Sequence, residues 1–183
     1  IEVKVTDDTE DIFLATKYGL SIRFKESDVR ITGRVSYGVI GMKLDPGDQV
    51  IGMQMESQGE YMLVASEKGY GKRTRISEFK SQLRNGRGLL CYNVTEKTGC
   101  LVGMKLVDDE RDIMLITNEG ILIRMSVDDI SVIGRNTSGV KLMSIDPDSN
   151  VRVATIAKVR ESIPFIRGIT VSGGECALYP EFL

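Results

Sequence analysis

The sequence contains no histidine and no tryptophan, and only three cysteines among its 183 residues. Without histidine, the chain lacks the commonest general base, the commonest metal ligand and every Ser–His or Cys–His pair. Cys91, Cys100 and Cys176 include no C-x-x-C pair, so they indicate neither a zinc site nor a disulfide framework. A phosphate-binding loop of the form G-x-x-x-x-G-K-S/T is also missing. These absences argue against a catalytic role.

Long apolar runs are missing as well. No stretch approaches the roughly 18 residues that a membrane-spanning helix requires, and no charged segment followed by an apolar one suggests a signal peptide. With 42% hydrophobic residues and a net charge of −2, the chain is expected to be globular, cytoplasmic and without membrane contact. Because it opens on Ile1 within an alternating pattern, we expect a fragment of a longer protein.

What the sequence does contain is an internal repeat. "DIFLATKYGLSIRF" at residues 11–24 returns as "EYMLVASEKGYGKRT" at 60–74 and as "DIMLITNEGILIRM" at 112–125. Four sets of landmarks recur at spacings of 50 and 51 residues, namely Gly19, Gly69 and Gly120; Arg23, Arg73 and Arg124; Arg34, Arg84 and Arg135; and Gly38, Gly88 and Gly139. The chain therefore holds three copies of one unit.

Each unit is predicted to form four short strands. The first two are β-rich and joined by a tight turn at a glycine, which supplies the positive φ that the turn requires. In the first copy, the other two strands are expected at 37–44 and 49–55. Four strands per repeat of about 50 residues are typical of propeller blades, so we predict an all-β, propeller-like partial array. A two-sheet sandwich is the alternative.

The predicted boundaries follow the repeat. Residues 1–162 form the β-pinwheel portion, in which 1–7 are the last strand of a preceding blade. Three blades span 8–57, 58–108 and 109–162. Residues 163–183 match no repeat and stay unassigned.

Positive charge collects on the second strand of each unit and on the loop that follows it. Between residues 71 and 105, eight lysines and arginines face only two glutamates. Equivalent positions of stacked repeats line up, so the periodic arginines are expected to form a basic rim suited to a phosphate backbone. The candidate DNA-binding residues are Arg23, Arg30, Arg34, Lys72, Arg73, Arg75, Lys80, Gln82, Arg84, Arg87, Arg124 and Arg135.

Base reading is not indicated. No recognition helix is visible, and aromatic residues make up only 6% of the chain, too few for the stacking platforms of single-strand binders. We therefore expect contacts with phosphates that depend on salt and tolerate any sequence.

Three stretches resemble the C-terminal domain of DNA gyrase A: "EKGYGKRT", "GRVSYGVIGMKLDPGDQVIGM" and "GRNTSGVKLMSIDPDSNVRVATI". The resemblance covers residues 1 to about 160, and the related topoisomerase IV protein fits less closely. It implies a six-bladed β-pinwheel, of which this chain supplies the last three blades, with duplex DNA wrapped around a basic perimeter.

The resemblance also implies a parent protein. That parent is a bacterial type IIA topoisomerase that introduces negative supercoils with ATP and Mg²⁺, in the cytoplasm at the nucleoid. The partners of this segment would be double-stranded DNA, the remainder of the gyrase A polypeptide and the second gyrase polypeptide, gyrase B. The catalytic residues of the parent lie outside this chain, so we expect neither a catalytic residue nor a cofactor or metal in this segment.

One motif departs from the family pattern. The gyrase A box, Q-R-R-G-G-K-G, has only a degenerate counterpart at residues 82–88, where Leu83 replaces a cation and Asn85 a glycine. Weak association without wrapping is therefore expected.

Two other functions stay open at this point. A propeller can act as a protein-interaction scaffold, in which the cations of the rim serve only to keep that surface solvated. An enzyme would need convergent acids, whereas the acidic residues here lie in connections that look like turns.

Overall fold

The computed structural model describes residues 2–159, so the tail predicted at 163–183 lies outside the described residues. Each repeat contributes one antiparallel hairpin and one later strand to a small sheet. In order, the strands are β1 (Asp11–Thr16), β2 (Leu20–Lys25), β3 (Val50–Met55), β4 (Tyr61–Ser66), β5 (Tyr70–Arg75), β6 (Leu89–Leu90), β7 (Leu101–Val107), β8 (Asp112–Thr117), β9 (Leu122–Ser126), β10 (Val140–Lys141) and β11 (Val153–Lys158).

Helical structure in the described residues is limited to single 3₁₀ turns. They span Glu26–Asp28, Glu56–Gln58, Ile76–Glu78 and Val127–Asp129. No helix within residues 2–159 is long and apolar enough to cross a membrane. The prediction of an all-β fold with one sheet per repeat is confirmed.

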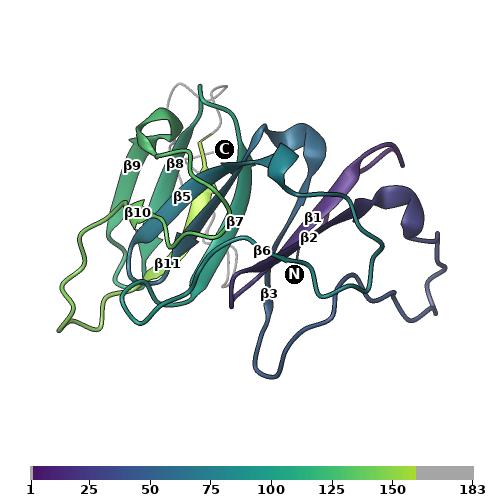
Figure 1. The fold of residues 1–183 in the computed structure, drawn as a ribbon, viewed down its shortest axis with the longest axis horizontal. Coiled ribbons are helices and arrows are strands. Elements are labelled where there is room, and N and C mark those ends of the chain that lie inside the picture. Colours follow the sequence, from purple (N-terminus) through teal and green to yellow (C-terminus); the bar gives the residue numbers. More distant parts are fainter. Residues whose placement is uncertain (1, 160–183) are drawn as a thin grey trace, which may run out of the picture.

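The sheets exchange strands between repeats. Their strand orders are β3-β1-β2-β6, β10-β5-β4-β7 and β11-β8-β9. The second repeat thus lends β6 to the first sheet, and the third repeat lends β10 to the second (Figure 1). Within the described residues, the third sheet has three strands because no later repeat supplies its fourth.

One expected strand is absent. Residues 37–44 are not a strand, and only Met42 makes an isolated bridge, to Gly86. The equivalent segments of the other repeats pair with the hairpin of the preceding sheet, and no hairpin precedes this one in the described part of the chain.

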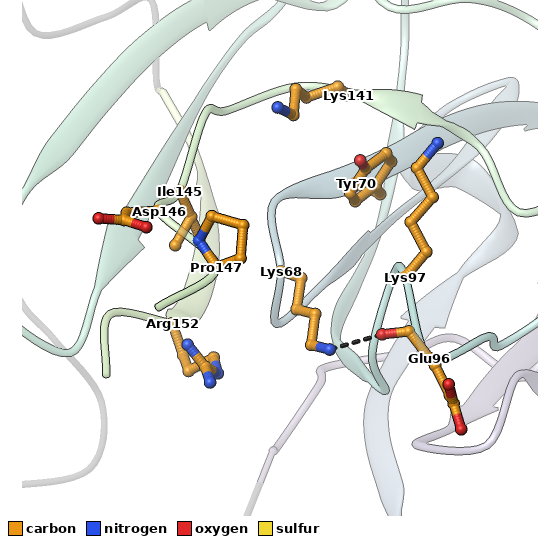
Figure 2. Close-up of a pocket in the computed structure, with 9 residues that line it drawn as sticks. All are labelled: Lys68, Tyr70, Glu96, Lys97, Lys141, Ile145, Asp146, Pro147 and Arg152. Carbon is orange, nitrogen blue, oxygen red and sulfur yellow. Dashed lines mark hydrogen bonds between the residues drawn. The ribbon is translucent and has the colours of Figure 1, made fainter. Parts of the chain in front are cut away.

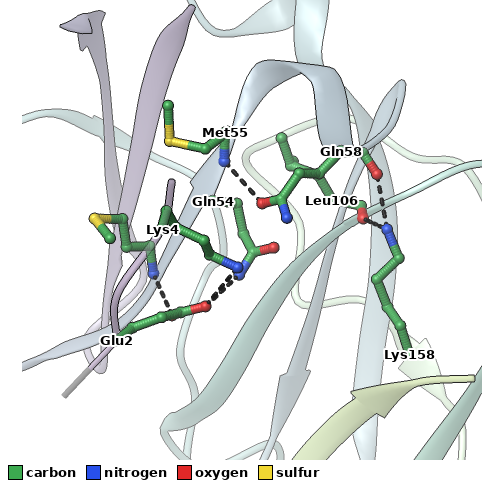
Figure 3. Close-up of polar contacts among 8 residues, drawn as sticks. Glu2, Lys4, Gln54, Met55, Gln58, Leu106 and Lys158 are labelled. Carbon is green, nitrogen blue, oxygen red and sulfur yellow. Dashed lines mark hydrogen bonds and ion pairs between the residues drawn. The ribbon is translucent and has the colours of Figure 1, made fainter. Parts of the chain in front are cut away.

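The N-terminal residues 2–7, expected as the strand of an earlier blade, are likewise not in a strand. They are held instead by Glu2, whose carboxylate accepts hydrogen bonds from Met53 N and Gln54 Nε2, both at 3.1 Å (Figure 3).

The hairpins follow from the local sequence. At the three turns, Gly19, Gly69 and Gly120 have φ of 86°, 79° and 81°, a left-handed conformation that glycine adopts without strain. In β4, successive side chains alternate between two cores, because neighbouring residues of a strand point to opposite faces. Met62 and Val64 join a core shared with β1, whereas Leu63 joins one shared with β8. The middle sheet is therefore buried on both faces.

The last strands of the three repeats pack against one another. β7 contacts β3 on one side and β11 on the other. A Cβ added to Gly103 would lie 2.9 Å from Ile156 Cγ1, so the absence of a side chain permits this close approach. Lys158 Nζ ties β11 to β7 and to the 3₁₀ turn after β3, because it donates to the carbonyls of Leu106 and Gln58 at 2.7 Å (Figure 3). β3, β7 and β11 thus form the inner edge of the array, and the exchanged strands lie on the opposite, outer edge.

Candidate nucleic-acid interface

The periodic arginines of the second strands are ion-paired. Arg23 donates to Asp11 Oδ2 at 2.6 Å and to Glu56 Oε1 at 2.5 Å. Its counterpart Arg124 donates through Nε to Asp112 Oδ2 at 2.7 Å. In both hairpins, an arginine near the end of the second strand reaches the aspartate that opens the first. The regular spacing of Arg23 and Arg124 therefore reflects an Arg–Asp ion pair that both hairpins form.

Arg73 is the most enclosed of these arginines, with only 5% of its surface exposed. Its Nε donates to the carbonyl of Ile130 at 2.6 Å, Nη1 pairs with Asp109, and the guanidinium lies over the Tyr61 ring. Arg73 therefore fastens the second unit to the third. The expectation that all six periodic arginines line an exposed rim is thereby corrected.

Two loop arginines serve the strand exchange. Arg84 Nε donates to the carbonyl of Asp28 at 2.9 Å, and Arg135 Nη1 donates to the carbonyl of Leu90 at 3.1 Å. Each side chain reaches from one repeat to the repeat before it. Their counterpart Arg34 is exposed, and no hydrogen bond or ion pair holds it within residues 2–159.

Lys72, a candidate DNA contact, is fully buried. Its Nζ donates to the carbonyls of Gly134 at 2.7 Å and Arg135 at 2.6 Å, and to Thr137 Oγ1 at 3.1 Å. Burial lowers the pKa of Lys72 to about 8, because the ammonium ion loses its hydration. Burial likewise raises the pKa of the neighbouring Cys91 thiol to about 12. Through these hydrogen bonds, Lys72 holds the exchanged loop of the third repeat against β5.

The remaining candidates lie on the surface. Arg87 and Arg124 have side chains that are 69% and 60% exposed, and each is also ion-paired. The exposed candidates are Arg30, Arg34, Arg75, Lys80, Arg87 and Arg124. Arg75 and Arg124 lie on β5 and β9, and the other four lie on the loops that follow the 3₁₀ turns after β2 and β5. These side chains are accessible to solvent.

The degenerate box at 82–88 forms part of this exchanged loop. Gln82 is half-buried, and its backbone N–H donates to the carbonyl of Arg23 at 2.8 Å. Asn85, which stands where the family pattern has glycine, has a left-handed φ of 66°. Asparagine tolerates that conformation better than most residues, so it is compatible with this backbone in place of glycine. Leu83, in place of a cation, is 80% exposed.

A second cationic group surrounds a pocket of about 370 Å³ between the second and third units (Figure 2). Its basic side chains are Lys68, Lys97, Lys141 and Arg152. Lys97 Nζ lies 5.4 Å from the centre of the Tyr70 ring, and Lys68 Nζ donates to the carbonyl of Glu96. This group cannot be recognised in the sequence, because its residues come from segments up to 84 positions apart (68 to 152). No local pattern indicates it.

Among the described residues, no group of three or more His, Cys, Asp or Glu side chains could hold a metal ion. The candidate site is thus a set of surface cations on the strands and loops of a β-scaffold.

Comparison with known families decides what scaffold this is. Residues 10–55, 60–108 and 111–160 match the family described as the DNA gyrase C-terminal domain, beta-propeller. The chain belongs to this family. The predicted family and propeller-type fold are therefore confirmed, and each match spans one of the three repeats.

Curated relatives agree with this assignment. The chain is 41% identical over 152 residues to the DNA gyrase A protein of Ureaplasma parvum. The aligned residues make up 83% of this chain and 18% of the relative. It is 42% identical over 164 residues to the DNA gyrase A protein of Staphylococcus epidermidis. That alignment makes up 88% of this chain and again 18% of the relative. The chain thus spans less than a fifth of these relatives.

Solved structures extend the likeness to the fold. A DNA gyrase A C-terminal domain superposes with a TM-score of 0.78 at 28% identity, covering 84% of this chain and 52% of the other. The C-terminal domain of a DNA topoisomerase IV gives 0.79 at 30% identity, covering 86% and 49%. In each case, this chain corresponds to about half of the solved domain.

Proposed function

We propose that this chain binds duplex DNA without sequence preference, through phosphates that lie along the exposed cations of its outer edge. The observation that carries the proposal is the placement of Arg75, Lys80 and Arg87 on the surface of the middle unit, beside the strand exchange. Arg75 ends β5, and Lys80 and Arg87 lie on the loop between β5 and β6, where water and a phosphate backbone can reach them. We further propose that the second cationic group, around the pocket of Figure 2, contacts phosphates of the same duplex.

Phosphates are the appropriate target for this surface. The helical structure of the described residues consists of single 3₁₀ turns, which are too short to read a major groove. Lysine and arginine bind phosphates through charge and donated hydrogen bonds, which carry no base information. Binding is therefore expected to depend steeply on salt and little on sequence.

The wider role follows from the family. We infer that the chain is part of a gyrase A polypeptide, where the C-terminal domain wraps DNA and thereby supports ATP-dependent negative supercoiling together with gyrase B. ATP, Mg²⁺ and the residues that cleave DNA would belong to other parts of that enzyme. Its place would be the bacterial cytoplasm, at the nucleoid.

The proposal can be tested with a fluorescent duplex, titrated at several salt concentrations. The test variant, Lys80→Ala with Arg87→Ala, removes two exposed cations from the outer edge. The matched control, Lys4→Ala with Lys105→Ala, removes two charges beside the inner strands, where Lys4 pairs with Glu2. Both variants lose the same net charge, so a difference between them does not come from the total charge of the chain.

The outer-edge variant should bind more weakly, and the slope of log K against log salt should fall by about 0.9 for each lost phosphate contact, or about 2 in total. The control should keep the wild-type slope. Ligation of nicked circles in the presence of the chain should leave the linking number unchanged, because the box is degenerate. Equal affinity for the outer-edge variant and the wild type would overturn the proposal and favour a protein-interaction scaffold.

A further inference from the structure

The cations around the pocket of Figure 2 are not a feature of the repeat. The place that Lys141 takes in the second sheet is taken by Leu90 in the first sheet. Likewise, Tyr18 stands before the turn glycine of the first hairpin, where Lys68 stands in the second. The boundary between the first and second units therefore forms without these charges, so the strand exchange does not explain them.

Two of the pocket cations are held in place by the backbone. Lys68 Nζ donates to the carbonyl of Glu96. Arg152 Nη1 donates to the carbonyls of Ser149 and Val151, at 2.9 and 2.6 Å. These contacts neutralise neither charge, because a carbonyl is not an anion. An ammonium group has three N–H donors and a guanidinium group five, so both side chains keep donors for a ligand.

The other two pocket cations, Lys97 and Lys141, are exposed. Within residues 2–159, no hydrogen bond or ion pair holds either ammonium group. Two carboxylates line the pocket as well, those of Glu96 and Asp146, and Figure 2 shows both directed away from the space between the cations. The pocket therefore has a positive charge that its own acidic residues do not balance.

Apolar side chains line the same space. Pro147 and Ile145 lie on one side of it and Tyr70 on the other (Figure 2). Lys97 Nζ lies 5.4 Å from the centre of the Tyr70 ring, so a cation adjoins the aromatic surface. The volume of about 370 Å³ is in the range of small-molecule sites, and a single phosphate would fill only a part of it. The pocket thus fits a ligand that joins a flat apolar group to several negative charges.

We propose that this pocket binds a nucleoside polyphosphate, with its phosphates among the four cations and its base between Pro147 and Tyr70. Lysine and arginine donate the charge-assisted hydrogen bonds that phosphate oxygens accept. Bases stack against aromatic and apolar side chains, which the two walls supply. Neither part of the ligand requires a side chain to leave the position that it has in Figure 2.

A bound nucleotide would compete with DNA. This consequence rests on the proposed function, in which the pocket cations contact phosphates of the duplex. The nucleotide would occupy the N–H donors of those cations, so the duplex would lose these contacts. The chain would therefore bind DNA less tightly where the nucleotide is abundant. Binding of the nucleotide itself does not depend on the proposed function.

Isothermal titration calorimetry on the whole chain tests the pocket with ATP, inorganic tripolyphosphate and adenosine, in buffer without Mg²⁺. ATP should bind at a single site. Tripolyphosphate should bind about tenfold more weakly, because it lacks a base to stack, and adenosine should show no measurable binding. Absence of ATP binding would overturn the proposal, and equal affinity for ATP and tripolyphosphate would overturn the assignment of a nucleotide.

Lys97→Ala with Lys141→Ala removes the two exposed pocket cations. ATP binding should weaken by about tenfold to a hundredfold, and the melting temperature should stay unchanged because both side chains are exposed. The matched control, Lys4→Ala with Lys105→Ala, loses the same net charge and should bind ATP like the wild type. Lys141→Leu is a second test variant, since Leu90 shows that leucine is compatible with this position of the fold. Unchanged ATP affinity in both pocket variants would overturn the proposal.

Competition is measured with the fluorescent duplex at constant ionic strength, with and without ATP at a concentration that saturates the wild type. ATP should raise the apparent Kd for the duplex in the wild type and leave it unchanged in Lys97→Ala with Lys141→Ala. ATP binding without any effect on the duplex would overturn the competition. A chain that binds ATP but no duplex at any salt concentration would instead refute the proposed function and support the nucleotide site.

Discussion

Arg73 and Arg87 look alike in the sequence, yet the structure predicts different consequences for their removal. Arg73 is 5% exposed and donates to the carbonyl of Ile130 and to Asp109. The side chain of Arg87 is 69% exposed, and its ion pair with Asp45 lies on the surface. Arg73→Ala should therefore change stability, and Arg87→Ala should change DNA binding.

The magnitudes follow from burial. Removing one partner of a buried ion pair costs about 3–5 kcal/mol, because the other groups are left without a partner. Asp109 is 49% exposed and can regain water, so we expect the lower end, about 3 kcal/mol. For a chain of this size, that loss lowers the melting temperature by roughly 6–12 °C. The exposed pair of Arg87 contributes about 1 kcal/mol at most.

Thermal unfolding followed by circular dichroism measures the first effect, and the salt-dependent duplex titration measures the second. Arg73→Lys is a useful third variant, since lysine keeps the charge but cannot reproduce the contacts of the guanidinium. It should recover only part of the lost stability. The reasoning is refuted if Arg73→Ala melts within about 2 °C of the wild type and weakens DNA binding as much as Arg87→Ala.

Two further predictions test the exchanged loop. Gly88→Ala places a Cβ 2.5 Å from the Ser21 carbonyl at a φ of 83°, so it should destabilise the chain by about 1–3 kcal/mol in urea unfolding; an unchanged midpoint would contradict the geometry. Lys72 has a pKa of about 8 in the folded chain against an ordinary lysine pKa of 10.5, so the unfolded chain binds more protons between these pH values. Stability should therefore rise from pH 8 toward pH 10.5 by up to about 3 kcal/mol relative to Lys72→Met, which lacks this titration; parallel profiles for the two proteins would show that Lys72 does not titrate in this window.

Much of the fold was predictable because its signals are local. The hairpins, their turn glycines and the spacing of 50 and 51 residues are all visible in the sequence, since a tight turn needs a positive φ within a few residues. The partner of an exchanged strand is not local. Residues 37–44 read as a strand, but in the structure only repeats that follow another hairpin place this segment in a sheet.

For the candidate site too, part could be predicted from the sequence and part could not. The sequence by itself determined that cations recur on the second strand and on the loop behind it, and that the chain carries the gyrase family pattern. Only the tertiary structure decided which of these cationic side chains are exposed to solvent. Lys72 and Arg73 lie in a sheet that is covered on both faces, where strand alternation no longer separates inside from outside, whereas Lys80 and Arg87 lie beyond that cover. Exposure depends on what packs from distant repeats, and no short stretch of sequence contains that information.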